Sequence, residues 1–386
     1  MSHRLARARN IADLREIARR RVARAFFEFM DRGTEDETQL RRNRAALDAV
    51  TLKPTVLTDV REINTATDLL GRAVPLPLAV APTGVANMMH YQGELALARA
   101  AARAGIPFTL ATSSTTAIED IAAAATSGFW LQLYVWEDRE ATWSVVERAR
   151  DAGAEALVVT VDTPVMANRE YNDRNGFSFP VRPDPVLIAD MLAHPRWLCP
   201  VMGRYWLTGG TPRFVNYPQR IGGKVTKGTS RMANSASVTW DDIARFRDRW
   251  DGRLILKGVL TPETAVKAGA IGADAVVVSN HGGRMFDPGP AAIEALGPVV
   301  RAAPDSLSVL FDSGIRRGAD ILRALALGAD GVLVGRATLY GLAAAGEEGA
   351  LKALDILAEE LRRCMALCGV RTIDEIGLDC LWKDGS

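Results

Sequence analysis

The sequence predicts an α/β protein built as a (β/α)8 barrel of the TIM type. Short apolar runs alternate with Ala-rich helical patterns, and most of those patterns end in a glycine suited to a helix C-terminus. Continuous apolar strands between helices are typical of a buried parallel sheet, and eight such units favour a closed barrel over an open sheet. The eight runs cover residues 78–84, 108–112, 130–135, 156–162, 254–258, 275–280, 308–314 and 331–336.

Other segments surround the barrel, which we place at residues 78–345 of a single domain covering 1–386. Residues 1–77 are expected to form an N-terminal helical extension followed by an irregular stretch. Residues 163–238 interrupt the fourth unit as a long, proline-containing loop insertion after strand 4, and residues 346–386 are expected to form C-terminal helices. An insertion of this length is usually a lid, a binding loop or a mobile segment.

Composition excludes several classes of protein. The chain has 47 Lys+Arg and 46 Asp+Glu, so nothing in its charge favours nucleic acid as a partner. Four cysteines without a CxxC pair argue against a zinc site or a disulfide framework, so we predict no metal and reduced thiols. The N-terminus lacks the apolar segment of a signal peptide, and no run of 18 apolar residues occurs. We therefore expect a cytoplasmic protein.

Polar residues occur where the apolar runs end. In a barrel of this type the catalytic groups come from the C-terminal ends of the strands, because the eight βα loops meet there. Applied to this chain, that rule selects Pro82, Thr83, Gly84, Thr112, Gln132, Tyr134, Thr160, Asp162, Lys257, Ser279, His281, Arg284, Asp312, Ser313, Gly314, Arg316, Gly335 and Arg336.

The last two strand ends indicate a phosphate site. Gly314 and Gly335 allow the backbone to approach a ligand closely, and Arg316 and Arg336 supply positive charge. The alternative is that these Gly-Arg pairs only close turns. A barrel that binds phosphate without catalysis also remains open at this point.

Two further side chains point to chemistry. His281 is the one histidine at a strand end, so it is a candidate general base with Asp162 as its orienting partner, although it could simply cap a loop. Lys257 ends an apolar run and should face a phosphate, a substrate anion or an electron-rich cofactor. A Schiff-base lyase using Lys257 is a competing hypothesis. Arg169 and Arg284 could clamp a carboxylate through paired hydrogen bonds, and Tyr134 could add another or only pack.

Taken together, the motifs resemble the FMN-dependent 2-hydroxy-acid oxidase and dehydrogenase family, from about residue 10 to 370. They are PTG at 82–84, LQLYV at 131–135, TVDTP at 160–164, LKG at 256–258, SNHGGR at 279–284, DSGIRRG at 312–318 and ALALGADGVLVGR at 324–336. The resemblance implies FMN and the oxidation of an (S)-2-hydroxy acid, here an aromatic one of the mandelate kind, to the 2-oxo acid. It also implies a quinone or O2 as electron acceptor and a homotetramer. An aliphatic substrate such as L-lactate is the alternative.

The resemblance also implies roles for individual residues. His281 would remove a substrate proton, Asp162 would stabilise the imidazolium, and Arg169 and Arg284 would hold the carboxylate. Tyr134 would contact the substrate, and Lys257 the pyrimidine end of the flavin. The remaining flavin contacts would be Pro82, Thr83, Gly84, Thr112, Gln132, Thr160 and Ser279, with Asp312, Ser313, Gly314, Arg316, Gly335 and Arg336 toward the ribityl chain and phosphate.

Two further features are a departure from the family pattern at Phe27 and a segment at 187–207 that is a candidate membrane contact. Phe27 is expected to stand where the family has a tyrosine that hydrogen-bonds the carboxylate, and losing that bond would cost on the order of 1.5–3 kcal/mol or mark a bulkier, more apolar substrate. The segment 187–207 is expected to contact the inner face of a membrane, or to serve as a lid or a subunit contact. Its candidate anchors are Trp197, Tyr205 and Trp206 beside Arg196 and Arg204.

Overall fold

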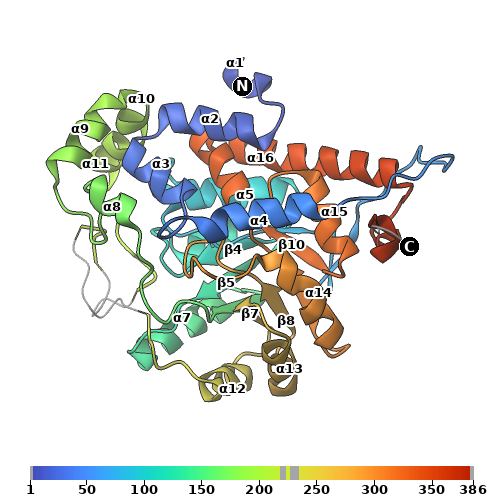
Figure 1. The fold of residues 1–386 in the computed structure, drawn as a ribbon. Coiled ribbons are helices and arrows are strands. Elements are labelled where there is room, and N and C mark those ends of the chain that lie inside the picture. Colours follow the sequence, from blue (N-terminus) through green and yellow to red (C-terminus); the bar gives the residue numbers. More distant parts are fainter. Residues whose placement is uncertain (1–2, 218–222, 227–233, 383–386) are drawn as a thin grey trace.

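A computed structural model describes residues 3–217, 223–226 and 234–382 of the chain. Eight parallel strands close into a barrel in which each strand pairs with the next and the last returns to the first, which confirms the predicted (β/α)8 architecture (Figure 1). The strands are β3 (Leu78–Val80), β4 (Phe108–Ala111), β5 (Phe129–Leu133), β6 (Ala156–Thr160), β7 (Arg253–Val259), β8 (Ala275–Val278), β9 (Ser308–Phe311) and β10 (Gly331–Val334).

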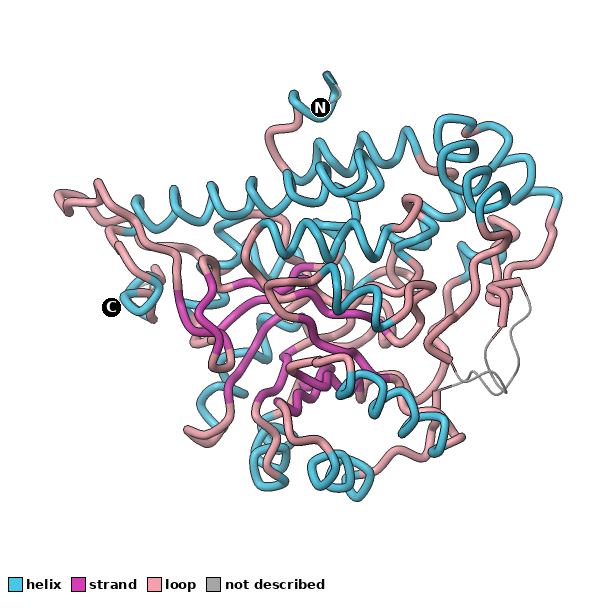
Figure 2. Tube along the Cα trace, turned by 180° about the vertical axis from the view of Figure 1, so that it is seen from behind, coloured by secondary structure: helices cyan, strands magenta, loops and turns pink. Residues whose placement is uncertain are grey.

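A helix follows each barrel strand and packs outside it, as Figure 2 shows from behind. Their local sequences explain their ends. In α13, for example, Thr261 accepts a hydrogen bond from the Thr264 N–H, Pro262 begins the helix, and Gly272 closes it with φ +86°. The helices are α5 (Gly93–Arg103), α6 (Ile118–Ala124), α7 (Arg139–Asp151), α12 (Trp240–Arg249), α13 (Pro262–Ile271), α14 (Ala292–Ala302), α15 (Gly318–Ala326) and α16 (Arg336–Cys368), with a short 3-10 turn, η1 (Ala86–Met88), before α5.

The N-terminal extension contains more order than the sequence indicated. Helices α1 (His3–Arg7), α2 (Ile11–Arg21), α3 (Arg24–Asp31) and α4 (Thr38–Ala49) come first. Residues 50–66 form no helix or strand, as expected, but the end of the stretch forms an antiparallel hairpin, β1 (Thr67–Leu69) and β2 (Arg72–Val74). Its Leu69 and Val74 pack with the side chains inside the barrel and close its N-terminal end. Strands of three residues are too short to show a clear alternating pattern.

The insertion after β6 is not a structureless loop, which corrects the expectation for residues 163–238. It contains α8 (Glu170–Arg174), α9 (Pro185–Ala193), α10 (Pro195–Leu198), a π-helical turn η2 (Cys199–Gly203) and α11 (Arg204–Thr208). Pro185 and Pro195 stand at the first position of a helix, where a missing N–H costs nothing, so prolines that looked like loop signals begin helices here. Residues 218–222 and 227–233, including Pro218, lie outside the described residues.

The C-terminal part follows β10 without a break. Helix α16 is kinked at Ala345 and Gly346, where the φ of Gly346 is +66°, at the boundary expected between barrel and C-terminal helices. Two 3-10 turns, η4 (Ile373–Glu375) and η5 (Leu378–Cys380), complete the described chain.

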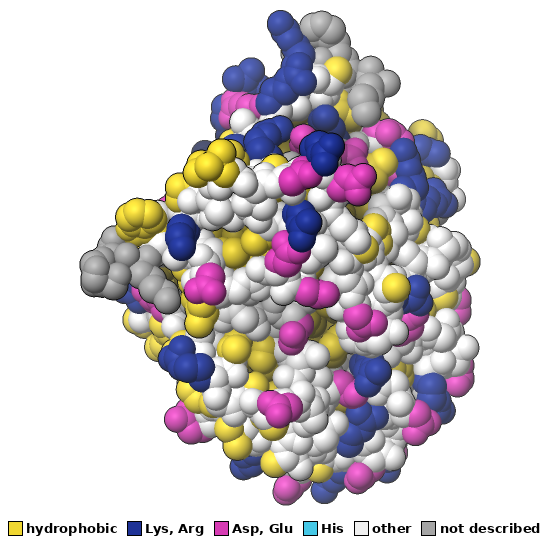
Figure 3. Space-filling view, turned by 90° about the vertical axis from the view of Figure 1, so that its right-hand side faces the viewer, with side chains coloured by type: hydrophobic (Ala, Val, Ile, Leu, Met, Phe, Trp, Pro, Cys, Tyr) yellow, Lys and Arg dark blue, Asp and Glu magenta, His cyan; other side chains and the backbone are white. Residues whose placement is uncertain are grey.

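Among the described residues, no helix is both long enough and apolar enough to cross a membrane. On the face shown in Figure 3, basic and acidic side chains are interspersed.

The barrel interior changes character along its axis. Alternate residues of each strand point inward, so on β6 the apolar Ala156 and Val158 are followed at the strand end by Thr160. On β8 the inward Ala275 and Val277 lie below the strand-end residue Ser279. The bottom of the barrel is therefore an apolar core, and the polar groups gather at its mouth.

Candidate active site

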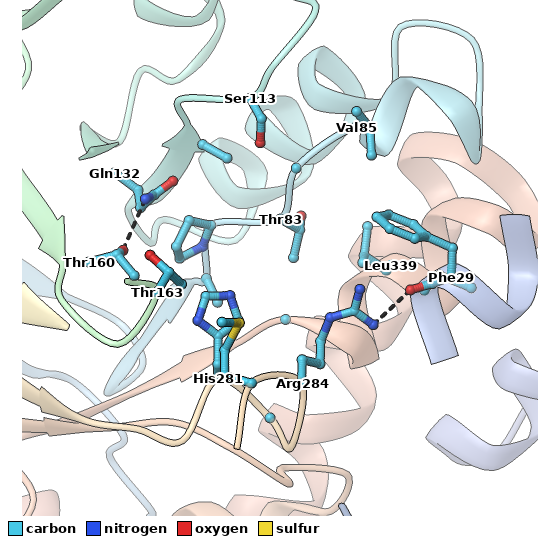
Figure 4. Close-up of a pocket in the computed structure, with 18 of the residues that line it drawn as sticks. Phe29, Thr83, Val85, Ser113, Gln132, Thr160, Thr163, His281, Arg284 and Leu339 are labelled. Carbon is cyan, nitrogen blue, oxygen red and sulfur yellow. Dashed lines mark hydrogen bonds between the residues drawn. The ribbon is translucent and has the colours of Figure 1, made fainter. Parts of the chain in front are cut away.

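A cavity of about 500 Å³ opens at the C-terminal ends of the strands. Helix α3, residues of the insertion and the strand ends all contribute to its wall, and Figure 4 shows side chains entering it from several sides. Most of the residues selected from the sequence line it: Pro82, Thr83, Gly84, Gln132, Tyr134, Thr160, Arg169, Lys257, His281, Arg284, Asp312, Ser313, Gly314, Arg316, Gly335 and Arg336.

Three selected residues stand behind the wall and contact residues on it. The Thr112 hydroxyl donates to the backbone carbonyl of Gln132 at 2.5 Å and accepts the Tyr134 N–H at 2.9 Å. The Ser279 oxygen accepts from Lys257 Nζ at 2.9 Å. Asp162 contacts His281. These groups can orient the residues in front of them.

The position expected for Phe27 needs correction. The Phe27 ring is buried, lies 5.6 Å from the Arg15 guanidinium carbon and does not line the cavity. The phenyl ring on the wall belongs to Phe29. Residues two apart in a helix point about 200° from each other, so the two rings of α3 face opposite directions. The substitution of a phenol by a phenyl group therefore has to be considered at Phe29.

His281 has the geometry of an oriented base. Its Nδ1 lies 3.1 Å and 3.2 Å from the two Asp162 oxygens, and its Nε2 lies 3.4 Å from the Tyr134 hydroxyl on the cavity side. The backbone here is left-handed, with φ +58° at His281, +67° at Gly282 and +72° at Gly283. The glycines make this turn accessible, whereas a side-chain-bearing residue in it is unusual and is often found at functional sites.

The neighbours of His281 have defined charge states. Burial alone would raise the pKa of Asp162, but attraction to His281, the hydrogen bond to it and attraction to Lys257 outweigh burial and lower that pKa. Asp162 is therefore a carboxylate at neutral pH. Burial and the charge of Asp162 raise the pKa of Tyr134, so its phenol keeps the proton that it can donate.

Lys257 is an ammonium held by an acid. Its Nζ lies 2.9 Å from Asp312 Oδ2, and the side chain is almost fully buried. Burial would lower the pKa of Lys257, yet attraction to Asp312 and Asp162 and the hydrogen bond to Asp312 raise it. A Schiff-base mechanism needs a neutral amine, so this ion pair argues against the lyase hypothesis.

Arginines give the cavity an excess of positive charge. Burial and, to a smaller extent, repulsion from Arg169 lower the pKa of Arg284 to about 10. Burial and, to a smaller extent, repulsion from Arg284 lower the pKa of Arg336 to about 10. The Arg336 guanidinium donates to the carbonyls of Met30, Arg32 and Gly282, which are neutral acceptors. Cations buried together in this way are stabilised by bound anions.

The comparisons with known proteins agree with this geometry. The family model for FMN-dependent dehydrogenases matches residues 18–383. The chain belongs to the FMN-dependent dehydrogenase family. Members of this family use FMN, and the chain is an FMN-dependent 2-hydroxy-acid dehydrogenase or oxidase.

Relatives of this FMN-dependent dehydrogenase carry two kinds of substrate name. It is 40% identical over 374 residues to a putative L-lactate dehydrogenase of Mycobacterium tuberculosis (strain ATCC 25618 / H37Rv), covering 97% of this chain and 89% of the relative. It is 41% identical over 373 residues to an L-lactate dehydrogenase of Caulobacter sp. (strain K31), covering 96% and 97%. Among solved structures, a monotopic membrane protein, (S)-mandelate dehydrogenase, has TM-score 0.91 at 35% identity over 98% of this chain and all of the other. A mandelate oxidase has TM-score 0.79 at 37% identity, covering 95% and 97%.

The residues of the cavity fit FMN. The Thr83 hydroxyl oxygen is buried on the wall without a hydrogen-bond partner, so it is available to a bound ligand. Gln132 Nε2 donates to Thr160 Oγ1 at 2.9 Å (Figure 4), and the Gln132 side-chain oxygen accepts the Thr112 N–H at 3.2 Å. The second Nε2 hydrogen and the second lone pair of the oxygen can serve a ligand. Ser313 and Gly314, with φ +84° and +96°, form a turn beside Arg316. This set offers hydroxyl, amide and cationic groups to a flavin ring, a ribityl chain and a phosphate.

The selection by strand ends also missed residues on the wall. Ser113 lines the cavity and Thr112 does not, because side chains alternate along the continuation of β4 and Ala111 already points inward. The hydroxyl of Ser113 occupies the space that a Cβ at Gly84 would fill, 2.5 Å from that position. Strict alternation from Ala111 would have selected Ser113. Phe179, which lies in the insertion, has no comparable signal in the sequence.

Proposed function

We propose that this enzyme oxidises an aromatic (S)-2-hydroxy acid of the mandelate kind to the 2-oxo acid, with His281 as the base. The observation that carries the proposal is the placement of His281 Nε2 on the cavity side, with Asp162 behind Nδ1 and Tyr134 in front. Two buried guanidiniums lie on the same cavity wall. This arrangement suits a substrate that carries a carboxylate beside a hydroxyl-bearing carbon.

The side chains on and behind the cavity wall are assigned separate roles in this reaction. Arg169 and Arg284 bind the carboxylate, and the Tyr134 phenol donates a hydrogen bond to the substrate. His281 Nε2 accepts the substrate proton, and the Asp162 carboxylate stabilises the imidazolium that results. Bound FMN supplies the two-electron acceptor. Lys257 is proposed to stabilise negative charge on the cofactor side of the cavity.

The aromatic substituent is proposed because of the apolar side chains around the cavity. Phe179, Phe214 and Tyr217 all contribute to the wall. A phenyl group would bury more of this surface than a methyl group, and the gain grows with the apolar area removed from water. L-lactate is the second candidate, supported by the names of the relatives in Mycobacterium tuberculosis and Caulobacter.

Anaerobic mixing of the purified FMN-loaded protein with (S)-mandelate, (R)-mandelate, L-lactate and glycolate tests the substrate. We expect (S)-mandelate to bleach the flavin absorption fastest and (R)-mandelate to leave it unchanged. Faster bleaching by L-lactate would replace the aromatic assignment with the aliphatic one. After air is admitted, rapid return of the colour identifies O2 as the acceptor, and slow return favours a quinone.

We further propose that α9, α10 and α11 contact a membrane surface. Figure 1 shows these helices gathered beside α3 and α8, away from the C-terminus. Leu192, Trp206 and Leu207 are exposed there to 66%, 56% and 90%. Two of the expected anchors need correction: Trp197 is buried with its Nε1 donating to the Met88 carbonyl, and the Tyr205 hydroxyl accepts the Gln92 N–H. The (S)-mandelate dehydrogenase structure is named as a monotopic membrane protein, which supports the proposal.

Binding to vesicles tests this surface. Leu207→Asp combined with Trp206→Ser is expected to abolish sedimentation with anionic vesicles while flavin reduction by (S)-mandelate stays at the parent rate.

The resemblance to the family also leads us to propose a homotetramer, for which light scattering should give four times the chain mass. A detergent-free monomer that does not bind vesicles would contradict both proposals.

A further inference from the structure

Phe29 has an unusual position between the two arginines proposed to bind the carboxylate. Its ring centroid lies 5.1 Å from the Arg284 guanidinium carbon and 5.8 Å from that of Arg169. Its backbone carbonyl also accepts a hydrogen bond from Arg284 Nη1 at 2.7 Å, and the Arg32 carbonyl accepts another at 2.9 Å. Figure 4 shows Arg284 reaching toward Phe29 across the lower wall of the cavity. One residue therefore contacts both guanidiniums.

The two guanidiniums need such a contact because they are like charges in a buried place. In the part of the chain that the structure describes, Arg169 and Arg284 form hydrogen bonds to backbone carbonyls and no ion pair with a carboxylate. Arg169 Nε is buried without a hydrogen-bond partner. Each cation thus lacks a counter-charge until an anion enters. The negative face of an aromatic ring attracts a cation without neutralising it, so the charge stays available to a ligand.

The ring is itself fixed by the insertion. Phe177 and Phe179 pack against Phe29 edge to face, with ring centroids 5.2 Å and 5.5 Å away and interplanar angles of 62° in both pairs. Edge-to-face contacts are favourable and directional, so they restrict the orientation of the ring. The orientation of the ring that contacts the guanidiniums is thereby restricted.

We infer that Phe29 is a positioning residue, whose ring holds the guanidiniums of Arg169 and Arg284 in the orientation that receives the substrate carboxylate. The identity of the carboxylate as that of a 2-hydroxy acid rests on the proposed function. A phenyl ring cannot donate a hydrogen bond, so the carboxylate is bound by the arginines, and Phe29 contributes through them.

Binding of phenylacetate to the oxidised FMN-loaded protein tests this role. Phenylacetate carries the carboxylate but has no hydroxyl to oxidise, and neutral phenylacetamide has the same shape without the charge. Titration followed by the change in flavin absorbance should give a Kd for phenylacetate that rises about tenfold in Phe29→Leu and stays within about threefold of the parent in Phe29→Tyr, which keeps the ring. The Kd of phenylacetamide should change by less than about threefold in both variants.

Kinetics provide a second readout. With whichever 2-hydroxy acid bleaches the flavin, Phe29→Leu should raise KM and leave kcat within about twofold of the parent. A general structural role would instead weaken both probes equally or lower the affinity for FMN, and either result would overturn the inference. Unchanged phenylacetate binding in Phe29→Leu would overturn it as well. Phe29→Met, which fills the space with a flexible apolar side chain, repeats the test if Phe29→Leu folds poorly.

A double-mutant cycle identifies the route of the effect. If Phe29 acts through the arginines, Phe29→Leu should weaken phenylacetate binding much less in an Arg169→Met background than in the parent. Additive effects would contradict the inference. Failure of the proposed function is seen separately, because (S)-mandelate and L-lactate would then leave the flavin unbleached while the phenylacetate titration still reports on the arginines.

Discussion

The two ends of the barrel use arginine in opposite ways. At the bottom, Arg247 and Arg253 both pair with Asp274, at 2.8 Å and 2.9 Å, and Arg72 pairs with Glu155. At the mouth, the guanidiniums of Arg169 and Arg284 donate to backbone carbonyls and face an aromatic ring. The bottom arginines are neutralised within the fold, whereas those at the mouth keep their charge for a ligand.

The difference between paired and unpaired arginines means that the bottom arginines contribute to stability, whereas the arginines at the mouth contribute to ligand binding. An arginine that is paired in the free protein stabilises the fold, and its loss leaves an unpaired carboxylate. A buried arginine without a counter-ion costs stability until a ligand arrives. Such an arrangement is expected where a protein gains binding energy from an anion, and it supports the proposed substrate and phosphate sites at the mouth.

The largest effect is expected from His281→Ala, which removes the base and leaves the arginines in place. The rate of flavin reduction by substrate should fall by about 10²- to 10⁴-fold, the range typical of a general base. Anaerobic stopped-flow absorbance measures this rate. The flavin content should stay at the parent level, since the phosphate end of the cavity is unchanged, and a variant that reduced FMN at the parent rate would disprove the assignment of His281.

A matched pair of variants tests the two ends directly. Arg169→Met at the mouth should lower kcat/KM by about 10- to 100-fold and leave the free energy of unfolding undiminished, because it removes a buried unpaired cation. Asp274→Asn at the bottom should lower the free energy of unfolding by about 1–3 kcal/mol, since it leaves Arg247 and Arg253 without a counter-charge. Its kcat/KM should equal that of the parent.

Urea unfolding of both FMN-free proteins gives the stabilities, and steady-state kinetics of the loaded proteins give kcat/KM. The proposed difference between the two ends is wrong if Arg169→Met is the less stable of the two variants. It is also wrong if Asp274→Asn is the less active.

A smaller, pH-dependent effect is expected from Glu94, a buried carboxyl of α5 that accepts hydrogen bonds from the Thr116 hydroxyl at 2.9 Å and the Asn87 N–H. Burial raises the pKa of Glu94 from 4.5 to about 7. The folded state therefore binds this proton more tightly than the unfolded state, so the contribution of Glu94 to stability is fully present below pH 4.5 and is lost as pH rises to about 7.

Glu94→Gln should remove this dependence. Between pH 5 and pH 7 the free energy of unfolding of the parent should fall by about 2 kcal/mol relative to the variant. Urea unfolding at several pH values measures the difference. Parallel curves would mean that Glu94 is charged throughout this pH range and would contradict the prediction.

Much of the fold followed from the sequence because the signals were local and repeated. Each barrel strand is a continuous apolar run, and Thr160, Lys257, His281 and Asp312 follow from the single rule that polar residues at strand ends face the mouth. These residues lie on the cavity wall or contact it without any knowledge of distant contacts.

The parts that sequence reasoning misplaced depend on direction or on distant packing. The family pattern places a tyrosine near Phe27 and Phe29, and which of these two rings faces the cavity depends on the rotation of successive side chains about α3. Trp197 looked like an interfacial residue, yet the fold buries it against Met88, which is 109 positions away in sequence. Phe179 reaches the cavity only because the insertion folds back over α3.

The left-handed backbone at His281 has a consequence for engineering. A glycine at this position would adopt the same φ without strain, which is worth on the order of 1 kcal/mol, but it would leave the buried Asp162 carboxylate without its partner. The strained histidine is therefore held in place by its contact with Asp162, and the two effects oppose each other in any substitution at this position. Stabilising designs for this enzyme should hold residue 281 fixed and seek their gains at the bottom of the barrel.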